Sequence, residues 1–390
     1  MEWWFHAPLA FCCLWVFALG LGVGSFLNVL IARLPYEKSV IWPSSRCFVC
    51  FQKIGLLDNL PIIGYLRLRG RCRKCGAAFS SKYLWVELGT GFAFLALYFV
   101  EIVLQAKDGP IVDGKPLFLA WHNTPGLRFP YVGNSAIPPL QTWVFFAFHA
   151  VLLAALIAAS MIDLKHRQIP AQITYVATFI GLISSTAFPW PWPTDPEVFK
   201  NSAEYLYLRD GRSWILPECE GLIPAGLSIW PFWGPFPTWA PAGSWQLGLM
   251  NGSLGAAVGM AIARGIKLVF ELGMGKEALG LGDADLLMMA GSFLGWQAIT
   301  LALPVGAVLT LFVVLPKMAF DRMRGRKVET QLPFGPGIAA GIVTCWFGWP
   351  WLGRLVQSVF FDLYVLGFII LLMGGGMLIA GLLLRRGKSV

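Results

Sequence analysis

Residues 143–167 read WVFFAFHAVLLAALIAASMIDLKHR, an apolar run that ends at Asp163 and passes directly into a basic stretch. About 20 apolar residues suffice for an α-helix to cross the hydrocarbon core of a bilayer. The stretch therefore predicts a transmembrane helix with an acid at its boundary. A carboxylate at that depth is costly to keep, so Asp163 is a candidate functional residue.

Similar apolar segments recur along the chain, which is 57% hydrophobic and only 13% charged, with 18 Trp. Soluble domains carry about a quarter charged residues. The segments lie at about 8–32, 84–104, 143–162, 171–188, 248–270, 334–352 and 360–384. A further stretch, 285–316, is long for one span, and its break at Gly295-Trp296 predicts two short helices. We expect an all-α polytopic membrane protein with about eight to nine transmembrane helices.

The charge of the connecting loops alternates. Residues 33–82 carry ten Lys and Arg but only two acids. The other basic connections are 163–167, 264–276, 317–327 and the C-terminal 385–388. By contrast, 105–141 and 189–247 are rich in Pro, Trp and Gly and carry mixed charges. The positive-inside rule places the basic loops in the cytoplasm and predicts two long exported loops.

This topology explains the net charge of +9 by solvated loops rather than by nucleic-acid binding. The first apolar run lacks a basic start and a small-residue cleavage site, so we expect it to remain as the first span. The N-terminus then lies outside and the C-terminus inside.

A second acid, Asp283, closes the stretch Gly280-Leu281-Gly282-Asp283 and precedes another apolar run. The topology puts it on the same face as Asp163. Two acids brought together by helix packing can share a proton, one as base and one as acid, as in aspartic proteolysis. Gly280 and Gly282, which lack Cβ atoms, would let backbone approach a substrate and permit unusual dihedral angles. Taken alone, Asp163 fits a snorkelling interfacial charge beside Lys165 and Arg167 better than a catalytic acid. The glycine-flanked Asp283 on the same face reverses this preference.

Four cysteines lie in the large basic loop as Cys47-x-x-Cys50 and Cys72-x-x-Cys75. Paired thiolates at this spacing are typical of a structural zinc site resembling a zinc ribbon. Two disulfides are the alternative, which a reducing cytoplasm opposes. Four protein ligands leave no open position, so the metal would organise the loop and would not activate water. The other cysteines, Cys12, Cys13, Cys219 and Cys345, form no such pattern.

Three further residues have open interpretations. Glu87, at the cytoplasmic start of the second span, could serve a methyl-transfer site or pair with Lys82. Asp285 follows Asp283 by two positions and would point away from it on a helix. His166 fits an ordinary solvated histidine better than a pH sensor.

An ordered set of motifs resembles the type IV prepilin peptidase family, the bifunctional leader peptidases and N-methyltransferases of bacterial inner membranes. The set comprises Gly24–Pro35, Asn59-Leu60-Pro61, Tyr65–Cys72, Val86-Glu87-Leu88, Ile162-Asp163, Ile169-Pro170, Thr174, Gly280–Asp283, Leu294-Gly295-Trp296, Pro333–Pro336 and Gly341.

The resemblance implies that the chain cleaves a basic leader from prepilins or pseudopilins at the cytoplasmic face. It also implies methylation of the new N-terminus with S-adenosylmethionine as donor. Asp163 and Asp283 match the catalytic pair, and the four cysteines match the metal loop. Two departures stand out: the family usually has Lys where this chain has Asp285, and the exported loops are unusually long. Those loops could contact pilus or secretion assembly components, and the chain could act as a homo-oligomer.

We expect three regions. Residues 1–104 form an N-terminal membrane and Cys-loop region associated with methyl transfer. Residues 105–142 form an exported loop, and 143–390 form the peptidase domain with the exported insertion 189–247. Two other functions remain open. The chain could be a non-enzymatic assembly factor that docks partners through the zinc loop, or a transporter whose acids relay protons.

Overall fold

The computed structural model describes residues 3–103, 111–112, 115–116, 140–188, 239–240, 244–275, 280–325, 334–361 and 363–386. The expected exported loops 105–141 and 189–247, with Cys219, lie almost entirely outside these residues. Within the first of them, β1 (Ile111–Val112) and β2 (Lys115–Pro116) pair as a short antiparallel ladder.

Six helices in the described part of the chain are long and apolar enough to cross a membrane. They cover Leu9–Tyr36, Lys82–Ile102, Trp143–His166, Trp245–Met274, Trp296–Met323 and Tyr364–Leu383, and shorter apolar helices cover Ala171–Ala187 and Gly335–Gly348. The expected all-α polytopic architecture is confirmed. The expected count of eight to nine spans stays a prediction, because several apolar helices are shorter than a full crossing.

The chain divides into two compact units, which are described separately: residues 1–107 with 129–170, and residues 108–128 with 171–390. The expected regions, with boundaries at 104 and 142, stay a prediction.

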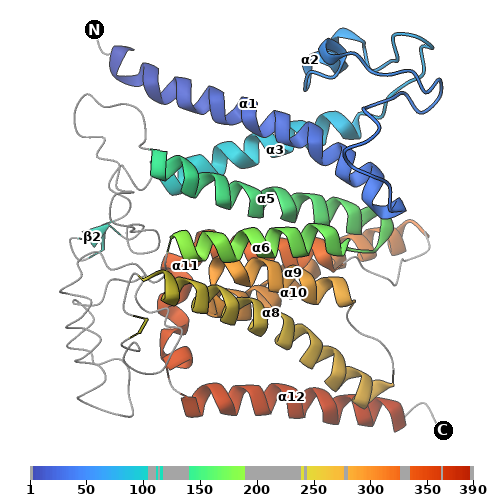
Figure 1. Ribbon diagram of the computed structural model, residues 1–390. Helices are drawn as coiled ribbons and strands as arrows, with labels where there is room; N and C mark the ends of the chain where they lie inside the picture. Colours follow the sequence, from blue (N-terminus) through green and yellow to red (C-terminus); the bar gives the residue numbers. More distant parts are fainter. Residues whose placement is uncertain are drawn as a thin grey trace. The chain divides into compact units, whose positions relative to one another are not determined.

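The first unit contains three long helices, α1 (Trp3–Arg33), α3 (Lys82–Tyr98) and α5 (Leu140–His166), with α3 continuing into the π-helical turn η3 (Phe99–Val103). All three pack together (Figure 1). Between α1 and α3 the chain forms the 3-10 turns η1 (Leu34–Tyr36) and η2 (Leu56–Asp58) and the short helix α2 (Ile63–Arg67).

Glycines let α1 and α3 approach closely. A Cβ atom at Gly20 would lie 2.8 Å from the Cα of Gly91, and one at Gly24 would lie 2.7 Å from the Cα of Glu87. Small residues at such crossings are characteristic of membrane helix pairs. Asn28 adds a polar link, since its Nδ2 donates to the carbonyl of Tyr83 at 3.0 Å.

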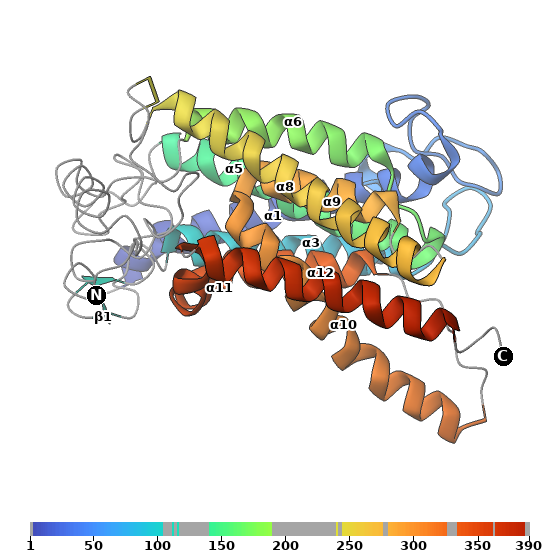
Figure 2. The same ribbon diagram turned by 90° about the horizontal axis from the view of Figure 1, so that it is seen from below.

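The second unit contains α6 (Ala171–Ala187), α8 (Trp245–Met274), α9 (Leu281–Leu294), α10 (Trp296–Met323), α11 (Gly335–Phe361) and α12 (Leu363–Arg386). α9 is its core, because α6, α8, α10 and α11 all contact it. Figure 2 shows α6, α8 and α9 running side by side. Where α8 meets α9, Gly255 lies against Gly291 and Gly259 against the backbone of Leu287.

The expected break at Gly295 is confirmed. This residue has φ 78°, which favours glycine, and it separates α9 from α10. The expectation of two short helices is wrong for the second one, since α10 has 28 residues and contains Pro304 and Pro316. Prolines are tolerated inside membrane helices when neighbouring groups satisfy the freed backbone.

Two expected basic loops are also largely helical. α8 continues to Met274 and α10 to Met323, so much of 264–276 and 317–327 belongs to these helices. Basic residues mark where a helix leaves the apolar layer, and they are themselves good helix formers. The helix therefore ends later than the apolar run does.

Candidate active site and metal centre

Asp283 lies in the first turn of α9, three residues after the N-cap Gly280. Its Oδ2 accepts a hydrogen bond from the backbone N–H of Gly280 at 3.2 Å. The side chain is buried, with 9% of the residue exposed. A carboxylate here meets the unpaired N–H groups and the positive end of the helix dipole. Gly280 has φ −72° and ψ 153°, ordinary for any residue, so unusual dihedral angles are not what this glycine provides.

Asp163 lies in the last turn of α5, and it is 7% exposed. Its carbonyl accepts from the N–H of Arg167 at 2.8 Å, which closes the helix. Arg167 has φ 55°, and α6 begins just after Pro170. The local fold agrees with an acid at a membrane-helix end. The pairing of Asp163 with Asp283 joins the two compact units and stays a prediction.

Asp285 is buried one half-turn beyond Asp283 on α9. Two residues are about 200° apart around a helix axis, which is consistent with different faces for the two acids. Burial opposes the charged form of Asp285, and the positive charge of Arg264 on α8 offsets part of this cost. The packing of α8 on α9 accounts for this proximity. Gly259 of α8 contacts Leu287 of α9, so the next turn of α8, which carries Arg264, faces the start of α9.

The four cysteines of the basic loop form one cluster, as expected. Their sulfur atoms all lie within 4.8 Å of one another. Cys47 Sγ is 3.7 Å from Cys75 Sγ, and Cys50 Sγ is 3.9 Å from Cys72 Sγ. Zinc–sulfur bonds of about 2.3 Å in a tetrahedron require sulfurs about 3.8 Å apart. The cluster therefore fits a tetrahedral metal, and all four cysteines are unpaired as disulfides.

Two matching turns present these sulfurs. In each, the N–H of the residue after the second cysteine donates to the carbonyl of the first: Phe51 to Cys47 and Gly76 to Cys72, both at 2.9 Å. Phe51 has φ 56° and Gly76 has φ 69°, so the chain reverses tightly after each pair. The isolated bridges Arg46–Lys53 and Arg71–Ala78 close the two turns into small hairpins.

Backbone N–H groups tune the thiols. Those of Cys50 and Val49 lower the pKa of Cys47 to about 6. At Cys75 the N–H of Ala77 acts to lower the pKa, but desolvation and the other sulfurs outweigh it and raise the pKa to about 11. Sulfurs this close cannot all be thiolates unless a cation balances their charge. The donor set is thus suited to a thiophilic metal.

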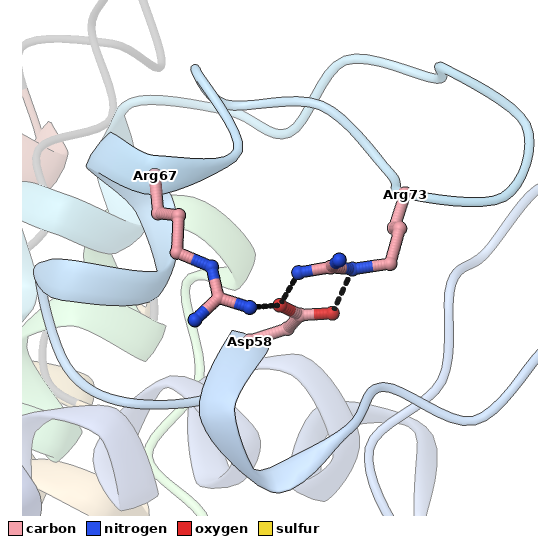
Figure 3. A network of polar contacts seen from close by, with 3 residues as sticks. All are labelled: Asp58, Arg67 and Arg73. Atoms are coloured by element: carbon pink, nitrogen blue, oxygen red, sulfur yellow. Dashed lines mark hydrogen bonds and ion pairs between the residues drawn. The ribbon is translucent and has the colours of Figure 1, made fainter.

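An ion-pair network holds the second hairpin to the segment between the cysteine pairs (Figure 3). Arg73 reaches Asp58 with two nitrogens, and Arg67 Nη2 lies 3.4 Å from the same carboxylate. The Asp58 side chain is 11% exposed. The hydrogen bond from Arg73 is the main cause that lowers the pKa of Asp58 below its ordinary value.

Glu87 holds the loop to α3. Its Oε2 accepts from the backbone N–H of Ile62 at 2.8 Å. Ile62 has φ 58° and precedes α2, so the acid satisfies a backbone group at a strained turn. The structure thus gives Glu87 a backbone partner, whereas one of the two open interpretations paired it with Lys82 or another loop cation.

One pair of buried polar residues was not anticipated from the sequence. Glu101 of η3 and His149 of α5 are buried, and Oε1 lies 2.5 Å from Nδ1. Each stands alone within an apolar run, 48 residues apart, and gives no sequence signal of pairing. His166 is half-buried, and its ring meets Tyr36 edge-on at 5.5 Å. The expected ordinary solvated His166 is thus partly covered, because Tyr36 of η1 packs against its ring.

Comparison with known proteins finds one matching domain model and a set of similar proteins. Residues 18–100 match the model of the bacterial peptidase A24 N-terminal domain, which covers α1, the cysteine loop and α3. Most of the chain is similar to a "Prepilin leader peptidase/N-methyltransferase" from Myxococcus xanthus, which is 28% identical over 88% of this chain and 92% of its own length. This similarity extends well beyond the matched domain, along most of the chain.

Two other proteins of the same name agree. That of Stutzerimonas stutzeri is 27% identical over 87% of this chain and 92% of its own length. That of Pseudomonas aeruginosa is 26% identical over 87% of this chain and 91% of its own length. No solved structure matches the chain. The expected resemblance is confirmed, and together with the apolar helices it indicates a bacterial inner-membrane protein.

Proposed function

We propose that the chain is a membrane aspartic endopeptidase that removes the basic leader from type IV prepilins or pseudopilins at the cytoplasmic face. The similarity along most of the chain to proteins named prepilin leader peptidase/N-methyltransferase carries this proposal. Two buried acids at helix ends, Asp163 and Asp283, support it, because they provide the acid and base that amide hydrolysis needs.

In the proposed reaction, one carboxylate takes a proton from water while the other, protonated, donates to the oxygen of the scissile amide. Asp283 is the better placed to carry negative charge, because it lies at the positive end of α9 and accepts the Gly280 N–H. Asp163, in the last turn of α5, is the better placed to hold the proton. Gly280 and Gly282 would leave room for the substrate backbone beside Asp283.

Methyl transfer to the newly exposed N-terminal amine is the second proposed activity, with S-adenosylmethionine as donor. The shared name of the relatives supports it. Glu87 is the candidate for donor binding, as a buried carboxylate between α1 and α3. Zinc is the proposed metal of Cys47, Cys50, Cys72 and Cys75, and it would stabilise the fold of the loop.

The proposed partners are prepilin or pseudopilin substrates within the lipid bilayer, without nucleic acid. We also propose that the chain can form homo-oligomers. Its exported loops are proposed to contact pilus or secretion assembly components. A non-enzymatic assembly factor is the second candidate, supported by the self-contained cysteine cluster. It requires that an Asp163→Ala/Asp283→Ala double variant stays functional while Cys72→Ser is defective.

Membranes containing the chain, a candidate prepilin and labelled methyl donor would test both activities, with mass spectrometry of the product. Asp163→Ala and Asp283→Ala should each lower cleavage at least about 100-fold with the protein still in the membrane. Asp321→Asn, at the end of α10, is a matched control that should cleave normally. Normal processing by either alanine variant would exclude the catalytic assignment.

A further inference from the structure

The segment between the two cysteine hairpins exposes an apolar stripe. Leu56 is 89% exposed and Leu57 61%, and three further side chains follow at a spacing of three residues: Leu60, Ile63 and Leu66. The other side of α2 is closed, because Gly64 packs on the backbone of Asp58. A short folded element thus presents leucine and isoleucine to its surroundings rather than to the loop's own interior.

The stripe is held beside the start of a membrane-spanning helix. Ile62, within the stripe, donates its N–H to Glu87 at 2.8 Å. Glu87 is five residues into α3, about 7.5 Å along the axis from Lys82. Trp85, 69% exposed, lies in the same turns, where tryptophan marks the interface between lipid and water. Figure 1 shows α2 in the connection at the end where α1 finishes and α3 begins.

Basic side chains border the stripe. Arg67 and Arg73 are half-exposed, and Arg69 and Arg71 are exposed as well. Asp58 is the acid of this segment, and both Arg67 and Arg73 bind it. A basic peptide would be repelled by this edge, whereas phosphate groups suit guanidinium ions well.

We propose that η2 and α2, with Leu56, Leu57, Leu60, Ile63 and Leu66, form an interfacial anchor that lies in the headgroup layer of anionic phospholipids. The apolar stripe enters the boundary with the acyl chains, and the arginines contact lipid phosphates. This combination of an apolar face and a basic rim is typical of segments that lie on a membrane surface. The anchor fixes the height of the cysteine loop above the bilayer, independently of the proposed function.

The test uses the full chain in lipid nanodiscs. Amide exchange across residues 56–67 should be about fivefold slower in discs containing phosphatidylglycerol than in phosphatidylcholine discs. A single arginine in contact with an anionic headgroup accounts for an effect of this size. A Leu56→Ser/Leu57→Ser variant should lose this difference. Its Phe51 and Gly76 amides, which close the cysteine hairpins, should keep wild-type exchange and so report that the loop is folded.

A photo-crosslinking residue at position 57 should form lipid adducts in anionic discs, and one at the exposed Gln52 should form few. Equal exchange in both lipids would overturn the proposal. Adducts at position 57 with a peptide or a second copy of the chain, rather than with lipid, would also overturn it and would identify a protein-docking surface.

Discussion

Arg73 binds Asp58 through two nitrogens, with Nε 2.8 Å from Oδ2 and Nη2 2.5 Å from Oδ1. Arg73 stands between the two cysteines of the second pair, and Asp58 belongs to η2. The ion pair therefore connects the second cysteine hairpin to the proposed membrane anchor. A bidentate arginine–carboxylate pair is geometrically more specific than a single contact.

Replacing Asp58 by Asn should loosen this connection. We expect faster proteolysis between the two cysteine pairs at pH 7, measured by limited digestion of the purified chain. Because Arg73 lowers the pKa of Asp58, the folded pKa lies below the unfolded value of about 3.9. The stabilisation of the folded loop by this ion pair is complete above the unfolded pKa. It is lost only as the pH falls through the lowered pKa of the folded state. The difference between wild type and variant should thus be constant from pH 5 to 8, and a difference that changes within this range would contradict the assignment.

Removing the Glu87 carboxylate should free Ile62. In Glu87→Ala the half-buried N–H of Ile62 loses its acceptor, which costs about 1 kcal/mol. Digestion near residues 60–67 should become faster. Glu87→Gln retains an acceptor oxygen and should stay close to wild type. If the two variants were equally protease-sensitive, charge rather than this hydrogen bond would hold the loop.

The cysteine cluster should bind about one zinc per chain by elemental analysis. Cys47→Ser and Cys72→Ser should each lose most of the metal, since a serine hydroxyl is a poor replacement for a thiolate. Cys345→Ser is the control, because Cys345 is buried in α11 outside the cluster. Unchanged metal content in the cluster variants would exclude the site.

A methyl group at Gly255 should separate α8 from α9. The added Cβ would overlap the carbonyl of Gly291, and such overpacking costs about 1–3 kcal/mol. Gly255→Ala should therefore lower the midpoint of thermal unfolding in detergent. Gly265→Ala, on the same helix, meets nothing within 4 Å and should be neutral or stabilising. Equal midpoints for the two variants would contradict the close contact.

The Arg264 and Asp285 charges should be coupled. Arg264→Gln leaves the buried Asp285 carboxylate without a favourable charge and should cost about 0.5–1 kcal/mol, a small value because the arginine is exposed. Asp285→Asn in the same chain should restore the thermal midpoint. Additive losses in the double variant would show that the two residues act independently.

Much of the fold follows from the sequence because membrane helices are determined locally. An apolar run of bilayer length must form a helix to satisfy its own backbone, so the segments around 8–32 and 143–162 were predictable. The break at Gly295 was predictable from one residue. The ends of α8 and α10 were not, because the polarity of a residue marks the membrane boundary and not the end of a helix.

Within the candidate site, the sequence by itself determined the four-cysteine cluster, since two thiolates three positions apart are already spaced to bind one metal ion. It also determined that Asp163 and Asp283 stand at helix ends. Only the tertiary structure decided that Glu87 binds the backbone of Ile62, that Arg73 binds Asp58, and that Glu101 meets His149. These contacts join residues 15 to 48 positions apart, and the packing of helices and loops, rather than any local pattern, selects which partners meet.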